Sequence, residues 1–180
     1  NNLEITAVAG VIQVNPAPVI ITPTPGQSKV FGTNDPVFTF TNNAGLTANN
    51  FTGALGRAGG SNVGTYAYTL SIGNLSAGPN YSLVLSAVAP VSTFAITTKS
   101  VIITPTAGQS KVYGSNDPVF TFANNAGLTA GAFTGALGRA GNNNVGTYAY
   151  TLGNLSAGTN YSLSLSSVAP VSTFAITKAP

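Results

Sequence analysis

The sequence predicts a mainly β protein, a tandem of two small β-modules, each most simply an immunoglobulin-like sandwich. Residues 19–70 return as 101–152 with 44 of 52 positions identical, and residues 73–97 return as 153–177 with 22 of 25 identical. Short stretches of each copy alternate apolar and polar residues, and turn-forming residues interrupt them about every 8–12 residues. Helical periodicity is almost absent, so a β-grasp-like sheet with one short helix is the alternative.

The repeat also predicts the domain organisation. Residues 19–99 form β-repeat 1 and residues 100–180 form β-repeat 2. Residues 1–18 are predicted to be the end of a preceding module or a linker, because their GVIQVNPAP resembles the STFAITKAP that closes the second copy. The chain has no methionine, even at position 1, so we expect a segment of a longer array. The join between the copies has almost no slack, which predicts a semi-rigid connection between neighbouring repeats.

The first third of each copy contains two short strands and a turn. Residues 19–22 are a β-branched run that ends at two prolines, which favours an edge strand or a strand end. Residues 29–31 are a second short strand. Residues 32–36 form a turn, because glycine accepts positive φ, Asn and Asp bond to nearby backbone, and proline fixes φ. The structural turn residues are therefore Asp35, Pro36, Asp117 and Pro118.

Alternation predicts the remaining strands. In residues 37–41 the two phenylalanines share one face, and residues 65–70 are the clearest strand, with tyrosines on the inner face. Residues 81–86 and 91–97 are the last two strands. Residues 42–50 are predicted to be a loop, and residues 51–58 to hold a helical turn or a short strand. The two copies support this interpretation, since Val84 becomes Ser164 where the alternation predicts solvent.

Composition excludes several classes of function. Only 5% of the residues are charged, and the 6 basic against 3 acidic residues give a net charge of +3. The basic residues are spread singly, whereas nucleic-acid binding needs them clustered on one face, so no nucleic-acid partner is expected. No apolar run reaches the roughly 20 residues of a membrane span. Each repeat has one acidic residue and no histidine or cysteine, which leaves acid–base and nucleophilic catalysis without a partner group.

Several spaced motifs resemble the MBG and YDG families of bacterial extracellular repeats. They are GQSKVYG with its Asn-Asp-Pro turn, Gly-Arg followed by VGTY, the pair Asn160-Tyr161, and the closing TFAITKA. The resemblance covers residues 20–97 and 102–179. It implies a module of long arrays in large secreted or surface-attached proteins, many of them adhesin-like, with no shared catalytic residue. An extracellular or cell-surface location is the corresponding expectation.

We therefore assign no catalytic residue, no cofactor and no metal ligand, and expect a stalk or spacer that extends a distal binding region of a surface adhesin. The alternative is a module that binds a glycan or host protein or mediates self-association. Its candidate surface contacts are Phe31, Phe51, Tyr113 and Phe133. An exposed cluster of these aromatic side chains would favour binding.

The Asn-Asp turn and the lysines offer two further chemistries, calcium binding and an isopeptide bond. Calcium binding by the Asn-Asp pairs is less favoured than side-chain bonding within the turn, because calcium needs 6 to 8 oxygen ligands. An isopeptide bond between Lys29 or Lys99 and an asparagine, with Asp35 as the acid, is less favoured than lysines that protect exposed strand edges.

Overall fold

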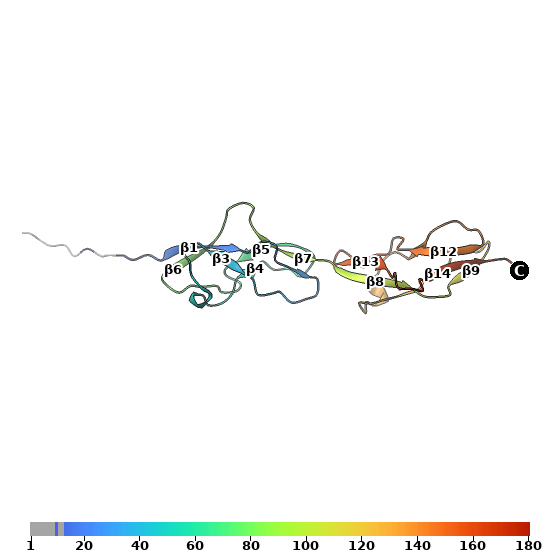
Figure 1. Ribbon diagram of the computed structural model, residues 1–180, viewed down its shortest axis with the longest axis horizontal. Coiled ribbons are helices and arrows are strands. Elements are labelled where there is room, and N and C mark those ends of the chain that lie inside the picture. Colours follow the sequence, from blue (N-terminus) through green and yellow to red (C-terminus); the bar gives the residue numbers. More distant parts are fainter. Residues whose placement is uncertain (1–9, 11–12) are drawn as a thin grey trace, which may run out of the picture. The chain divides into compact units, whose positions relative to one another are not determined.

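The computed structural model describes residue 10 and residues 13–180, and these form short β-strands connected by turns (Figure 1). The predicted end of a preceding module at residues 1–18 lies largely outside the described residues. The strands of the first copy are β1 (Ala17–Pro23), β2 (Ser28–Val30), β3 (Phe40–Asn42), β4 (Gly56–Arg57), β5 (Gly64–Thr69), β6 (Tyr81–Leu85) and β7 (Thr93–Thr97). Those of the second are β8 (Lys99–Pro105), β9 (Ser110–Val112), β10 (Phe122–Asn124), β11 (Gly138–Arg139), β12 (Gly146–Thr151), β13 (Tyr161–Leu165) and β14 (Thr173–Thr177).

Each copy contains a three-stranded and a four-stranded sheet. The strand orders are β3-β1-β6 and β2-β7-β5-β4 in the first copy, and β10-β8-β13 and β11-β12-β14-β9 in the second. The prediction of a mainly β tandem is thus confirmed. Each sheet also includes one parallel pair, β8 with β13 and β14 with β9 in copy 2, a connection that side-chain alternation does not reveal.

The two sheets of copy 2 share one core. In copy 2, Val101 and Ile103 of β8 pack in the same cluster as Phe174 and Ile176 of β14 and Tyr150 of β12. In β8 the buried Val101, Ile103 and Pro105 alternate with exposed residues, and in β14 the buried Phe174 and Ile176 flank a half-buried alanine, so one face of each of these strands is buried. A sandwich-like arrangement follows. Among the described residues, the residues that are buried as a whole and form the core are hydrophobic.

Local differences from the sequence predictions have physical causes. The strand expected at residues 37–41 begins only at Phe40, because the N–H of Thr39 bonds to the side chain of Gln27 at 2.8 Å instead of to a strand. The proline-terminated run, β1, is the central strand of its sheet, and Pro23 is its last residue. Residues 51–58 hold the two-residue strand β4. The one-turn helices are the 3₁₀ turns η1 (Ala48–Asn50) and η2 (Ala130–Ala132), just before this segment and its counterpart.

The chain divides into two compact units. The first contains the described part of Asn1–Gln27 with Pro36–Gly59 and Tyr66–Phe94, and the second contains Ser28–Asp35, Gly60–Thr65 and Ala95–Pro180. The second unit therefore holds all of copy 2 together with three segments of copy 1. The domain boundaries at 18/19 and 99/100 describe the sequence copies and stay a prediction.

Candidate functional site

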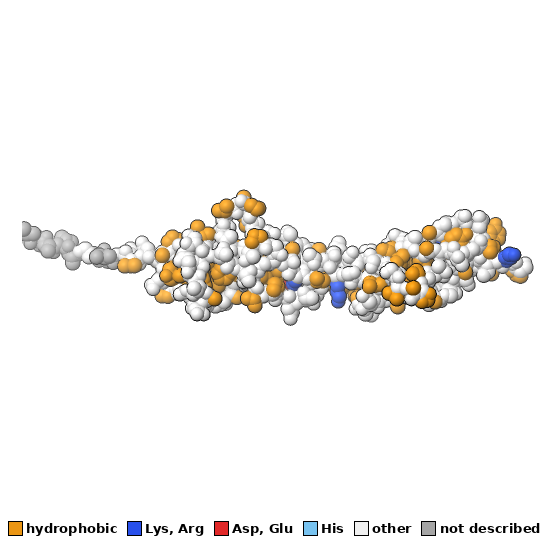
Figure 2. Space-filling model, in the orientation of Figure 1, with side chains coloured by type: hydrophobic (Ala, Val, Ile, Leu, Met, Phe, Trp, Pro, Cys, Tyr) orange, Lys and Arg blue, Asp and Glu red, His pale blue; other side chains and the backbone are white. Residues whose placement is uncertain are grey.

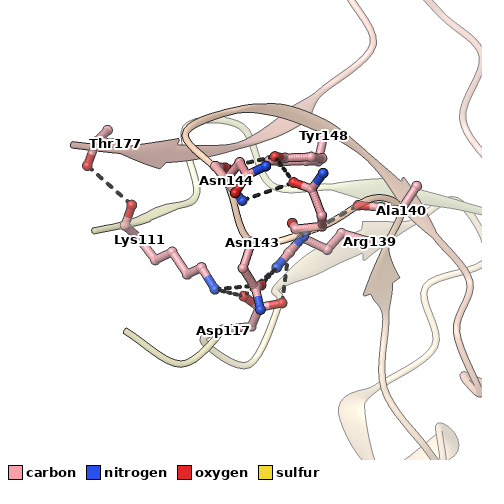
Figure 3. Close-up of polar contacts among 9 residues, drawn as sticks. Lys111, Asp117, Arg139, Ala140, Asn143, Asn144, Tyr148 and Thr177 are labelled. Atoms are coloured by element: carbon pink, nitrogen blue, oxygen red, sulfur yellow. Dashed lines mark hydrogen bonds and ion pairs between the residues drawn. The ribbon is translucent and has the colours of Figure 1, made fainter. Parts of the chain in front are cut away.

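The principal polar cluster of copy 2 lies beside its Asn-Asp-Pro turn (Figure 3). The turn carries Asp117, β9 supplies Lys111 and β11 supplies Arg139. The carboxylate of Asp117 lies 2.6 Å from Nζ of Lys111. It also accepts two hydrogen bonds from Arg139, from Nε at 2.8 Å and from Nη2 at 3.1 Å. One carboxylate thus joins two strands of the four-stranded sheet to the turn.

The guanidinium of Arg139 is held from several sides. Its Cζ lies 5.1 Å from the ring centroid of Tyr148 and 5.6 Å from that of Phe174. Nη1 donates to the backbone oxygen of Asn142 at 2.6 Å, and Nη2 also donates to Oδ1 of Asn143. The side chain is only 7% exposed. Aromatic rings and hydrogen-bond acceptors therefore fix this cation against the core.

The charges in the cluster determine what it can do chemically. The hydrogen bonds from Arg139 hold the pKa of the Asp117 carboxyl below its ordinary value, and Lys111 acts in the same direction. An ionised carboxylate can neither donate the proton that isopeptide formation requires nor lose a hydroxyl to an amine. The geometry therefore supports an ion pair that closes the turn rather than a covalent link.

Two of these contacts recur in copy 1, the lysine–aspartate pair in the second unit and the arginine–aromatic contact in the first. Nζ of Lys29 lies 2.6 Å from the Asp35 carboxylate, and Cζ of Arg57 lies 4.8 Å from the Tyr66 ring centroid and 5.3 Å from that of Phe94. Lys29 and Lys99 were expected to protect exposed strand edges. Lys29 lies on the edge strand β2, but its side chain is only 11% exposed and pairs with the Asp35 carboxylate, as Lys111 at 6% pairs with Asp117. Lys99 is exposed at the start of β8.

The turn itself departs from the expected mechanism. Sequence reasoning assigned the aspartate to bonding within its own turn, whereas the Asp117 carboxylate contacts Lys111 and Arg139. The hydrogen bond from the N–H of Ser115 to the backbone oxygen of Val112, at 3.1 Å, closes a turn at residues 112–115, just before Asp117. An arginine 22 residues away was the missed partner, and its only sequence signal was the return of Asp and Arg at the same spacing in both copies.

A glutamine in each copy forms a second polar network that sequence reasoning missed. Nε2 of Gln109 donates to the backbone oxygens of Thr106 and Thr121 at 3.0 Å each and to the hydroxyl of Tyr150 at 3.1 Å. Its Oε1 accepts from the N–H of Thr121 at 2.8 Å. Gln27 makes the equivalent contacts in copy 1. This side chain thus links segments that follow β8 and precede β10 to a core residue of β12.

The four candidate contact residues do not gather into one aromatic cluster. Phe51 packs edge-to-face on Phe40 with ring centroids 5.2 Å apart, and Phe133 does the same with Phe122 at 5.2 Å. Phe31 packs on another aromatic ring in the second unit. Tyr113 is 52% exposed. Beside Phe133 a pocket of about 270 Å³ is lined by further apolar side chains, including those of Phe120, Phe122 and Leu128.

Metal-ligating side chains do not gather in the part of the chain that the structure describes. Within residues 10 and 13–180, no three His, Cys, Asp or Glu side chains come together as metal ligands would. No helix in this described part is both long and apolar enough to cross a membrane. On the face shown in Figure 2, white atoms of the backbone and of uncharged side chains lie between groups of orange hydrophobic atoms, and few Lys or Arg atoms are visible.

Comparison with models of protein families shows the family to which the repeat belongs. The family model described as MBG domain (YGX type) matches residues 19–88 and 101–168, which is more than half of the chain. The chain therefore belongs to the MBG domain family, whose members are typically non-catalytic repeats in extracellular surface proteins. Tyr113-Gly114-Ser115 matches the YGX pattern in the family's description, and Phe31-Gly32-Thr33 stands at the equivalent place in copy 1. Comparisons with curated proteins and with solved structures gave no match.

Proposed function

We propose that this chain is a spacer segment of a bacterial cell-surface or secreted adhesin, in which serial β-repeats hold a distal binding region away from the cell. The observation that carries the proposal is the join between the copies. Strand β7 ends at Thr97 and β8 begins at Lys99, so a single residue separates the last strand of one copy from the first strand of the next. With a join this short, we expect each added copy to increase the length of the array by a similar amount.

The chemistry of the modules supports the same role. Both copies keep the same buried residues, while the substitutions between them fall at exposed positions such as Val84/Ser164, apart from the half-buried Phe31, which is Tyr113 in copy 2. The ion pairs and the glutamine network tie each copy together and leave the chain with no grouped reactive side chains in its described part. Such a module is suited to bearing load and giving reach. An extracellular location agrees with the family and with a surface built from Thr, Ser and Asn.

Small-angle scattering tests the proposal on this chain and on a version extended by one further copy. We expect the maximum dimension to grow by the same increment for each added copy. A maximum dimension that stays constant when a copy is added would contradict the spacer function.

The second candidate function is ligand binding at the pocket beside Phe133. Its apolar aromatic lining is the specific observation in favour, because aromatic rings stack against sugars and apolar side chains. The test is a glycan array probed with the chain and with Phe133→Ala, using Val84→Ser as the matched surface control. Binding that the first variant loses and the second keeps would support this function, and no binding by the parent chain would contradict it.

A further inference from the structure

The second unit contains a contact between the Asn160-Tyr161 pair and segments of copy 1. The ring of Tyr161 meets that of Phe31 edge-to-face, with centroids 5.4 Å apart and planes at 78°. Oδ1 of Asn160 accepts a hydrogen bond from the backbone N–H of Val63 at 2.8 Å, and its Nδ2 donates to Oδ1 of Asn62 at 3.0 Å. All five residues belong to this one unit. The Asn-Tyr pair at the start of β13 is thus contacted by an aromatic ring, an N–H and an amide oxygen.

The same three groups recur in copy 2. Tyr113, Asn144 and Val145 stand at the positions that Phe31, Asn62 and Val63 occupy in copy 1. We call these three residues of copy 2 the Tyr113 face. Tyr113 is 52% exposed and Val145 is 47% exposed, whereas their counterparts in copy 1 are half-buried.

The loop that presents the Tyr113 face is held by its own copy. The hydroxyl of Tyr148 donates to the backbone oxygen of Asn144 at 2.7 Å. The N–H of Asn144 donates to Oδ1 of Asn142 at 2.9 Å. Because these contacts fix the backbone before any partner arrives, docking on this face needs little ordering of the loop.

Copy 1 has its own Asn-Tyr pair, equivalent to the pair that contacts Phe31, Asn62 and Val63. Asn80 and Tyr81 correspond to Asn160 and Tyr161, and the backbone oxygen of Asn80 accepts from Ala17 at 2.9 Å as that of Asn160 accepts from Lys99 at 3.0 Å. A pocket of about 340 Å³ lies beside this pair and is lined by Tyr81, Pro79 and residues 14–17. The Asn-Tyr pair of copy 1 therefore borders open space.

We propose that the Tyr113 face binds the Asn-Tyr pair of a following copy of the same repeat, so that each copy carries one half of a joint at either end. The inference rests on the proposed spacer function and specifies how neighbouring copies recognise each other. The contact of Phe31, Asn62 and Val63 with Asn160-Tyr161 indicates that an Asn-Tyr pair is what the Tyr113 face binds. Tyr113 keeps the aromatic ring of Phe31, and Asn144 keeps the amide oxygen of Asn62. A face of only three residues gives weak binding on its own. A neighbouring copy in the same chain can still occupy it, because the covalent link holds that copy at a high effective concentration.

The test extends the chain by attaching residues 101–180 directly after Pro180. Three residues then separate Thr177 from the valine of the added copy, the same spacing as between Thr97 and Val101. Amide hydrogen exchange is measured by NMR at Val145 in the two-copy and three-copy chains. We expect the added copy to slow exchange at Val145 by at least about tenfold, as for an amide that gains a protected hydrogen bond. Unchanged exchange at Val145 would overturn the proposal.

Variants of the chain as it stands provide the controls. Asn160→Ala should speed exchange at Val63 by about tenfold or more, because it removes the acceptor of that N–H. Asn80→Ala, the matched change at the other Asn-Tyr pair, should leave exchange at Val63 unchanged. Equal effects of the two variants would count against the joint.

The outcome is separable from that of the spacer function. If the maximum dimension grows with copy number while exchange at Val145 stays fast, the joint is wrong and the spacer function stands. If exchange at Val145 slows while the maximum dimension does not grow, the joint stands and the spacer function is wrong.

Discussion

Replacing Gln109 by alanine should destabilise copy 2 far more than a half-exposed glutamine ordinarily would. The side chain bonds to Thr106, Thr121 and the hydroxyl of Tyr150, and so joins loop segments to a buried residue of β12. Tyr150 is 6% exposed, so water replaces its lost donor poorly, at a cost of about 1–3 kcal/mol. The threonine groups are exposed and regain bonds to water, which limits their loss to about 0.5 kcal/mol each.

The total is a loss of about 3 kcal/mol in the free energy of unfolding. For a module of this size it corresponds to a fall of roughly 12–24 °C in melting temperature, at about 4–8 °C per kcal/mol. Urea unfolding and calorimetry measure the two quantities. Gln27→Ala should have the same effect on copy 1, because its three donor distances are the same as those of Gln109.

Gln13→Ala is the control, because Gln13 is exposed, and it should change stability by less than about 0.5 kcal/mol. Burial raises the pKa of Tyr150, and the hydrogen bond from Gln109 lowers it, so Gln109→Ala should raise this pKa further in an ultraviolet titration. A loss of under about 1 kcal/mol for Gln109→Ala would refute the reasoning, since it would mean that water replaces the whole network.

Three further predictions concern the ion pairs, the core and one turn. The folded-state pKa of Asp117 lies below its ordinary value of 3.8. The ionised carboxylate therefore stabilises the fold above pH 3.8, and this stabilisation is lost as the pH falls through the folded-state pKa. Asp117→Asn should remove this acid dependence, which urea unfolding at several pH values measures. Phe174→Ala should cost about 3–5 kcal/mol by thermal unfolding, and Val84→Ser, at 45% exposure, less than about 0.5 kcal/mol; equal costs would be inconsistent with the core. Gly135→Ala should lower the free energy of unfolding by about 2 kcal/mol or more in thermal unfolding, because φ is 74° and a Cβ would meet the backbone oxygen of Asn154. Gly131→Ala is the control and should be tolerated, because a Cβ at Gly131 would stand in open space.

The sequence predicts the strands well where burial alone determines them. Phe94 and Ile96 alternate with exposed residues in β7, and Val84 faces solvent in β6, as the period of two requires. The internal repeat supplied the test of this alternation, because substitutions between the copies mark exposed positions. Family membership also follows from local motifs, and the match over both copies confirms it.

Features that depend on contacts distant in the sequence could not be predicted in the same way. The partners of Asp117 and Gln109 come from strands that only the topology brings near. The parallel pairing of β8 with β13 joins residues about 60 positions apart, and side-chain alternation is the same for parallel and antiparallel neighbours. The backbone-bonded turn spans residues 112–115 and ends before Asp117, whose carboxylate bonds to side chains of β9 and β11.

The most direct test of the central claim, that one structural module is used twice as a mechanical spacer, is to stretch the chain by its ends in a single-molecule experiment. We expect two unfolding events of nearly equal length, each releasing about 80 residues and roughly 260–290 Å of extended chain. A single event, or two events of clearly unequal length, would contradict the account.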